Sequence, residues 1–147
     1  MFKKISGYIS AYALWVVVLL LGVWAGYLSQ RALLGLAAKY YLNDEFMRQT
    51  LIRALDRWYV FVVGLIWLVL MVVTEELFRQ SVVKGGLFRR FSFYAGFLLL
   101  IIFIFDFILF SLVGWNLDPF LLGILGLELI MCVGLIYFWA KTRKTKA

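Results

Sequence analysis

The sequence contains no histidine, a single cysteine (Cys132) and a single proline (Pro119). Without histidine, the chain has no imidazole ligand for haem or a metal ion, and no Ser-His or Cys-His pair for nucleophilic catalysis. One cysteine excludes an intramolecular disulfide and any metal site built from several thiolates of this chain. These absences remove many common catalytic and metal-binding chemistries, and we expect no cofactor and no catalytic residue.

Charge is also scarce. Only 16% of the 147 residues are charged, whereas 65% are hydrophobic. A soluble domain has about 25% charged residues and about half apolar residues. The apolar excess therefore places the chain in a lipid bilayer.

The apolar residues form four runs of a length suited to crossing the hydrocarbon core, at residues 8–28, 58–77, 92–114 and 119–140. We read the chain as one all-α membrane domain over residues 1–147: a bundle of four transmembrane helices with a basic tail at residues 141–147. The second helix is expected to stop near Lys84, because Gly85 and Gly86 follow it.

Residues 29–57, between the first two spans, are neither a short loop nor apolar enough to cross the membrane. Apolar residues recur at helical spacing on both sides of Asn43, which is a good helix-capping residue and precedes Asp44. We therefore expect an amphipathic helical hairpin on the extracytoplasmic side. The hairpin either projects outward or lies flat in the membrane interface, and the pattern leaves both open.

Lysine and arginine are distributed unequally about the spans. One side receives ten, the other five, and cytoplasmic segments carry the excess. Both termini are therefore expected in the cytoplasm, in a membrane of the bacterial inner (plasma) type. The cytoplasmic charges are suited to anionic lipid head groups, and no pattern indicates nucleic acid. The expected head-group contacts are Lys3, Lys4, Arg89, Arg90, Lys141, Arg143 and Lys144.

Two acids interrupt the apolar spans. Asp106 and Glu128 each fall near the middle of a predicted span and are equally far from the turn between the third and fourth spans. They should therefore lie at one depth on adjacent helices, where desolvation and mutual repulsion favour the protonated form. We consider three roles: a hydrogen-bonded contact between helices, a contact with a partner subunit, and a proton or cation relay.

The remaining candidates are five glycines and one pair of an acidic and a basic residue. We expect small residues to let helices pack closely inside the bundle: Gly22 and Gly26 in the first span, and Gly123, Gly126 and Gly134 in the fourth. Glu75 is expected to pair with Arg79, four residues along the same helix.

The sequence predicts a small non-catalytic accessory or structural subunit of a larger membrane complex. Its transmembrane faces and the 29–57 segment would dock to other membrane subunits or to further copies, and no soluble substrate is indicated. The alternative is a small oligomeric transporter or channel, coupled to protons or cations, that uses Asp106 and Glu128. A third hypothesis, an enzyme acting on a lipid or quinone, rests only on Glu75, Glu76 and nearby aromatic residues.

Overall fold

The computed structural model describes residues 2–40, 45–113 and 119–144, all of which but Gly85 and Gly86 are helical. The four helices are α1 (Phe2–Tyr40), α2 (Glu45–Lys84), α3 (Leu87–Val113) and α4 (Pro119–Lys144). Each is long and apolar enough to cross a membrane. The expected cap at Asn43 and the turn at residues 114–118 lie outside the described residues.

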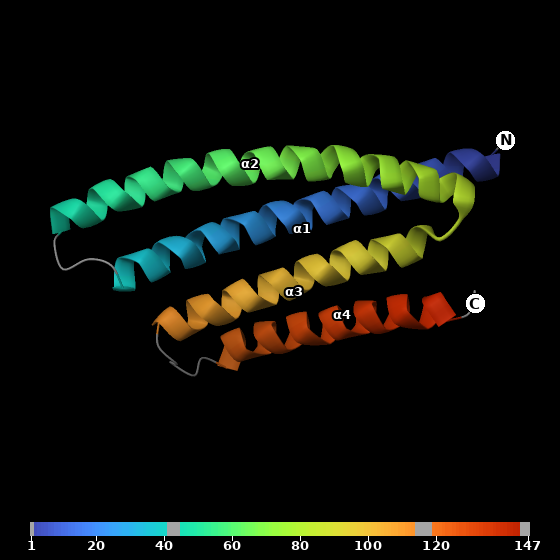
Figure 1. Cartoon of the computed structure of the whole chain (residues 1–147). Coiled ribbons are helices and arrows are strands. Elements are labelled where there is room, and N and C mark those ends of the chain that lie inside the picture. Colours follow the sequence, from blue (N-terminus) through green and yellow to red (C-terminus); the bar gives the residue numbers. More distant parts are fainter. Residues whose placement is uncertain (1, 41–44, 114–118, 145–147) are drawn as a thin grey trace.

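The four helices form the expected helical bundle and lie in an open row, in the order α2, α1, α3, α4 (Figure 1). α1 packs against both α2 and α3, and α3 packs against α4. Within the described residues, the backbone of α4 does not approach that of α1 or α2. A row of this kind leaves α2 and α4 as outer helices, each with most of its surface unpacked.

The beginning of α1 and the end of α4 lie at the same end of the molecule, together with the connection between α2 and α3 (Figure 1). We call this the basic end, because Lys84, Arg89, Arg90 and Lys141 lie there. The connection is short: α2 stops at Lys84, and Gly85 and Gly86 have φ of 76° and 92°. These left-handed conformations suit glycine, and the expected end of the second helix is confirmed.

The first two helices are much longer than a bilayer requires. α1 has 39 residues and α2 has 40, whereas α3 has 27 and α4 has 26. At 1.5 Å per residue, the first pair is about 60 Å long and the second about 40 Å, against a hydrocarbon core of about 30 Å. Both α1 and α2 continue as unbroken helices into the segment 29–57.

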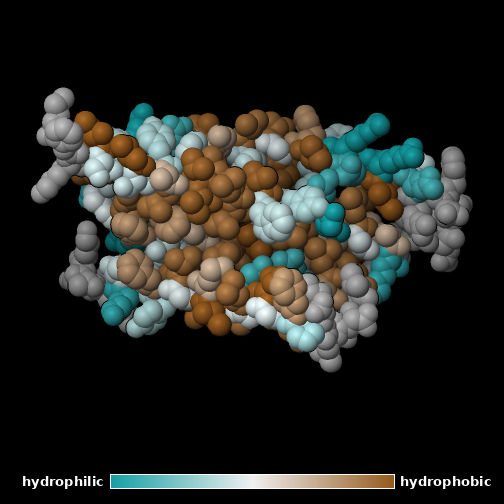
Figure 2. Space-filling model, turned by 180° about the vertical axis from the view of Figure 1, so that it is seen from behind, coloured by the Kyte–Doolittle hydropathy of each residue, from teal (hydrophilic) through white to brown (hydrophobic). Residues whose placement is uncertain are grey.

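The main cluster of buried apolar residues lies along α3, between α1 and α4. It contains Ala25 and Leu28 of α1, Leu99 and Ile102 of α3, and Cys132 of α4. α2 buries Phe78. The surface is correspondingly large, at 10693 Å² for a chain of 17.1 kDa. A compact soluble protein of this mass exposes about 7,800 Å². Hydrophobic residues cover most of the middle of the visible face, and hydrophilic ones lie mainly toward the two ends (Figure 2).

Candidate functional site

The carboxyl groups of Asp106 and Glu128 meet between α3 and α4. The two side chains are within hydrogen-bonding reach of each other. Glu128 is nine-tenths buried, Asp106 is half-buried, and Glu128 Oε2 has no hydrogen-bond partner. The expectation that the two acids lie on adjacent helices at one depth is therefore confirmed. The contact is available as a link between the two helices, with one carboxylate oxygen left over.

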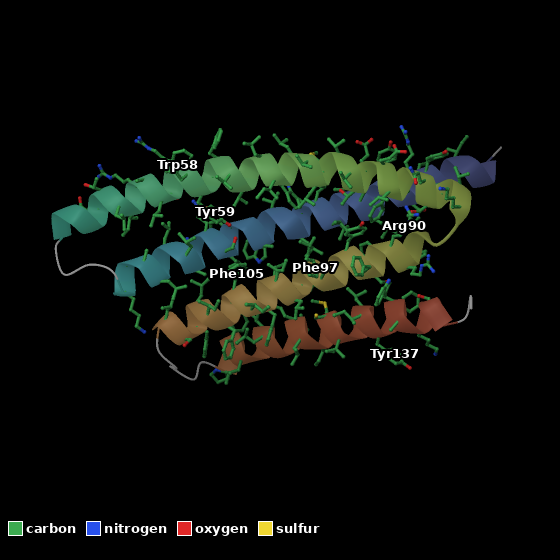
Figure 3. The ribbon with its side chains drawn as sticks, in the orientation of Figure 1. Trp58, Tyr59, Arg90, Phe97, Phe105 and Tyr137 are labelled. Carbon is green, nitrogen blue, oxygen red and sulfur yellow. The ribbon has the colours of Figure 1, made fainter. Side chains whose placement is uncertain are left out.

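In the register of α3 against α1 and α2, the carboxyl pair lies level with the outer ends of the first two expected spans. The neighbouring residue, Phe105, lines a groove together with Ser29 and Tyr59, at the outer ends of the first two expected spans (Figure 3). Further along, the Leu112 side chain reaches Gly35, seven residues beyond the expected end of the first span. The apolar run at 92–114 is thus shifted outward relative to the run at 8–28 by about 10 Å. A hydrophobic run shows where a helix is able to cross, but not its register against its neighbours.

The shift changes the surroundings expected for the carboxyl pair. Asp106 lies 16 residues from Arg90, which is about 24 Å along α3. Polar groups of α1 and α2 lie at this level: Tyr59 donates to the Gly26 carbonyl at 2.9 Å and contacts the Ser29 hydroxyl. Gln30 Nε2 donates to Asp56 Oδ1 near this level.

The groove beside this level has a volume of about 960 Å³ and opens between α2 and α3 on the surface of α1. Aliphatic side chains of α1 and α2 line most of it, and Ser29 and Tyr59 supply its hydroxyl groups. The groove exists because α2 and α3 both pack on α1 but touch each other at few positions.

Among the glycines expected to permit close packing, only Gly22 would bring an added Cβ atom against a neighbouring helix. This Cβ would overlap the Trp67 ring of α2, so the glycine makes room for the indole. A Cβ at Gly26, Gly123, Gly126 or Gly134 would meet nothing within 4 Å. Gly26 nevertheless contacts α2, because its carbonyl accepts a hydrogen bond from Tyr59.

The glycines of α4 share the face turned away from α3. At 100° per residue, Gly123, Gly126 and Gly134 fall within about 80° of one another, centred opposite Cys132. Cys132 is buried against α3, where its Sγ lies 3.5 Å from the Gly96 carbonyl oxygen. Ile130, in the middle of the glycine face, is 73% exposed. We call Gly123, Gly126 and Gly134 the glycine face of α4.

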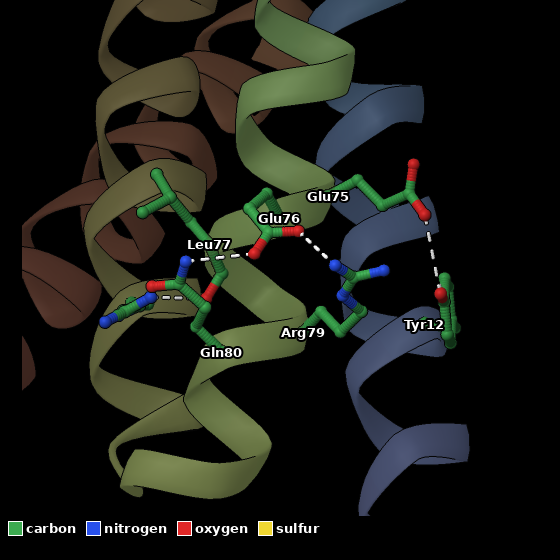
Figure 4. A network of polar contacts seen from close by, with 7 residues as sticks. Tyr12, Glu75, Glu76, Leu77, Arg79 and Gln80 are labelled. Atoms are coloured by element: carbon green, nitrogen blue, oxygen red, sulfur yellow. Dashed lines mark hydrogen bonds and ion pairs between the residues drawn. The ribbon is translucent and has the colours of Figure 1, made fainter.

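The acids near the basic end are occupied by polar partners (Figure 4). Glu75 accepts a hydrogen bond from the Tyr12 hydroxyl at 3.4 Å. Glu76 accepts from Gln80 at 3.0 Å and pairs with Arg79 at 2.7 Å. Arg79 therefore pairs with Glu76 rather than with the expected Glu75, because Glu75 points toward α1. These contacts link helices and turns and form no paired-carboxylate site.

The expected head-group residues are distributed over three helix ends. Arg89 and Arg90 line one cavity at the start of α3, and Lys141 is exposed near the end of α4. The side chains of Lys3, Lys4, Arg143 and Lys144 lie outside the described part of the chain. The described members all lie at the basic end.

Sequence reasoning did not identify Tyr59 or Gly96 as important contact residues. Tyr59 lies at the start of the second expected span, and its bond to the Gly26 carbonyl depends on the register of α1 and α2. A Cβ at Gly96 would lie 3.2 Å from Ile136 and 3.3 Å from Leu135, so this glycine allows α4 to approach α3. Its position in an otherwise large-residue apolar run was the available signal.

Comparison of the chain with protein-family models, with curated proteins and with solved structures gives no match. The function must therefore be argued from the helices and their contacts.

Proposed function

We propose that the chain is a non-catalytic accessory subunit of a larger membrane complex, and that the glycine face of α4 docks to another transmembrane helix. The observation that carries this proposal is the position of Gly123, Gly126 and Gly134 on one exposed face of an outer helix, opposite its contact with α3. The partner is a membrane subunit or a second copy of this chain.

A helix explains this face better than lipid does. Each glycine in a helix costs about 1 kcal/mol relative to alanine, and a lipid-facing position gains nothing in return. Between helices, small residues allow close approach and dispersion contacts along the backbones. The large exposed surface of the row is consistent with a subunit that is completed by neighbours.

The extensions of α1 and α2 supply a second docking region in this proposal. Because both helices continue beyond the length that a bilayer requires, residues 29–57 project outward from the membrane as a helical hairpin. The excess of lysine and arginine at the basic end assigns that end, with both termini, to the cytoplasm. The membrane is then of the bacterial inner type, and the hairpin is extracytoplasmic.

The test uses the full chain, extracted in mild detergent from the membranes in which it is made. Native mass spectrometry is expected to find an assembly larger than the 17.1 kDa chain. Gly126→Leu with Gly134→Leu should reduce the assembled fraction at least tenfold, because two large side chains separate the backbones. The matched control is Gly64→Leu on the other outer helix, where a Cβ also meets nothing within 4 Å.

Two results would reject the proposal. One is a wild-type chain that is monomeric under all mild conditions. The other is equal loss of assembly in Gly64→Leu and in the α4 variant, which would show that the glycine face has no special role.

A second candidate function is a proton- or cation-coupled transporter or channel, built from several copies. It is favoured by Glu128 Oε2, a buried carboxyl oxygen without a partner beside Asp106. In liposomes, Asp106→Asn or Glu128→Gln should abolish flux and leave assembly intact. Unchanged flux in both variants, or no flux in the wild type, would eliminate this candidate.

A further inference from the structure

At the basic end, residues of α2, α3 and α4 line an open cavity of about 370 Å³ that is separate from the carboxyl pair. Its lining combines two arginines with aromatic and aliphatic groups: Leu77, Arg89, Arg90, Phe93, Tyr94 and Trp139. Cavities of this size accommodate small ligands or head groups. The composition indicates a ligand with an anionic part and an apolar part.

One arginine of the cavity is held in place by the protein. Arg90 donates from its guanidinium to the Leu77 carbonyl oxygen at the end of α2, and its backbone N–H donates to the Gly86 carbonyl at 3.1 Å. The bond to Leu77 orients the guanidinium, and neither bond neutralises its charge. Arg90 is thus a preorganised cation, whose remaining N–H donors are available to a ligand.

The second arginine has no acidic neighbour among the described residues: no ion pair joins either Arg89 or Arg90 to a carboxylate in that part of the chain. The nearest acids along α2 are engaged elsewhere, Glu75 by Tyr12 and Glu76 by Arg79 and Gln80. Within the described part of the chain, the cavity therefore has two positive charges without a carboxylate partner.

The two arginines also lie at the N-terminus of α3. Both arginines lie in its first turn, which contains no acidic residue. A helix N-terminus carries partial positive charge, so each cation there is unfavourable for folding by a few tenths of a kcal/mol or more. A bound anion would interact favourably with the two arginines and with the partial positive charge of the helix N-terminus. The arrangement is costly for an empty cavity and favourable for an anion-binding one.

The aromatic residues identify the kind of anion. Phe93 and Trp139 lie with ring centroids 5.3 Å apart, linking α3 to α4 beside the arginines. Tyrosine and tryptophan prefer the membrane interface, where a lipid phosphate meets its acyl chains. We propose that this cavity binds the phosphodiester of an anionic phospholipid, with Arg89 and Arg90 as phosphate ligands and the aromatic rings against the glycerol and upper acyl region. Arginine forms paired hydrogen bonds with phosphate oxygens, which favours this assignment.

The site does not depend on the proposed subunit function. It is tested with the full chain in neutral detergent by titration with short-chain phosphatidylglycerol while thermal unfolding is followed. A ligand that binds the folded state raises Tm in proportion to ln(1 + [L]/Kd), so the titration gives an apparent Kd. Phosphatidylcholine and inorganic phosphate are titrated in parallel.

Arg89→Gln is the decisive variant, because Arg90 also holds the end of α2. It should weaken phosphatidylglycerol binding by at least about tenfold, the effect of losing a charged hydrogen bond. Arg89→Lys should recover part of the affinity, since it keeps the charge but loses the paired bonds. Lys84→Gln is the matched control, as it removes one exposed charge at the same end outside the cavity, and should change the affinity by at most about twofold.

Each contrary outcome overturns the proposal in a different way. Equal stabilisation by inorganic phosphate would identify a free-phosphate site. Equal loss in Arg89→Gln and Lys84→Gln would identify diffuse attraction to the basic end, without a defined site. No stabilisation by phosphatidylglycerol at any concentration would show that the cavity does not bind this lipid.

Discussion

The two helix pairs of this molecule are held together in different ways. α1 and α2 are joined by polar contacts spread along their length: Tyr12 with Glu75, Trp15 with Thr74, Ser29 with Tyr59, and Gln30 with Asp56. α3 and α4 are joined mainly by close apolar packing at Gly96 and by the single carboxyl pair of Asp106 and Glu128. The α1–α2 pair thus depends on several separate polar contacts, whereas the α3–α4 pair depends mainly on close packing and one carboxyl contact.

The difference reflects the forces available to helices in lipid. Because lipid tails are as apolar as leucine, burying apolar side chains between helices gains little. Association then relies either on hydrogen bonds or on the dispersion contacts that small residues allow. α2 buries the apolar side chain of Phe78 together with the polar residues Thr74 and Ser81. Its buried face therefore combines apolar and polar side chains.

The largest loss of stability is expected at Gly22, where α1 and α2 also pack closely. Gly22→Leu should destabilise the fold by about 3 kcal/mol, because the new side chain occupies the place of the Trp67 ring. The measurement is reversible unfolding in mixed micelles. The control is Gly26→Leu, one turn further along α1, where the added side chain meets open space. A similar loss in both variants would contradict the packing role of Gly22.

An intermediate effect is expected at the carboxyl pair. Asp106→Ala should cost about 1–3 kcal/mol, because it leaves the buried Glu128 carboxyl without its one hydrogen-bond partner. Replacing both acids, as in Asp106→Leu with Glu128→Leu, should recover most of this loss, since apolar pairs replace buried polar ones at little cost. A double-mutant cycle measures the coupling. Additive effects of the two single changes would show that the pair is not a link between α3 and α4.

The helices, their order along the chain and the end of α2 at Lys84 were all predictable from the sequence. Runs of apolar residues and the glycines after Lys84 act locally, and local signals are read directly from residue types. The contact between Asp106 and Glu128 was also predictable, because a short connection forces α3 and α4 to be antiparallel neighbours at a known register.

The order of the helices in the row and the register of α3 against α1 were not predictable. Both depend on how helices distant in sequence pack, and a helix that is apolar on all sides does not indicate which side its neighbour occupies. The glycines illustrate this: Gly22 and Gly26 are equivalent in sequence, yet an added Cβ would meet a side chain of α2 only at Gly22. Register between α1 and α3 is decided by contacts such as Gly35 with Leu112, for which no residue type is diagnostic.

The smallest effects are expected from single hydrogen bonds in the distributed set that joins α1 to α2. Tyr59→Phe removes a part-buried hydroxyl that bonds the Gly26 carbonyl, and should cost about 0.5–1.5 kcal/mol. Tyr12→Phe removes an exposed bond of 3.4 Å to Glu75 and should cost no more than about 0.5 kcal/mol. The two variants delete the same atom from the same residue type, so unfolding measured side by side isolates burial as the cause. Equal losses of unfolding free energy would mean that solvent exposure does not weaken these hydrogen bonds. A Tyr59→Phe loss well above that of Asp106→Ala would mean that the first pair, too, depends on one dominant contact.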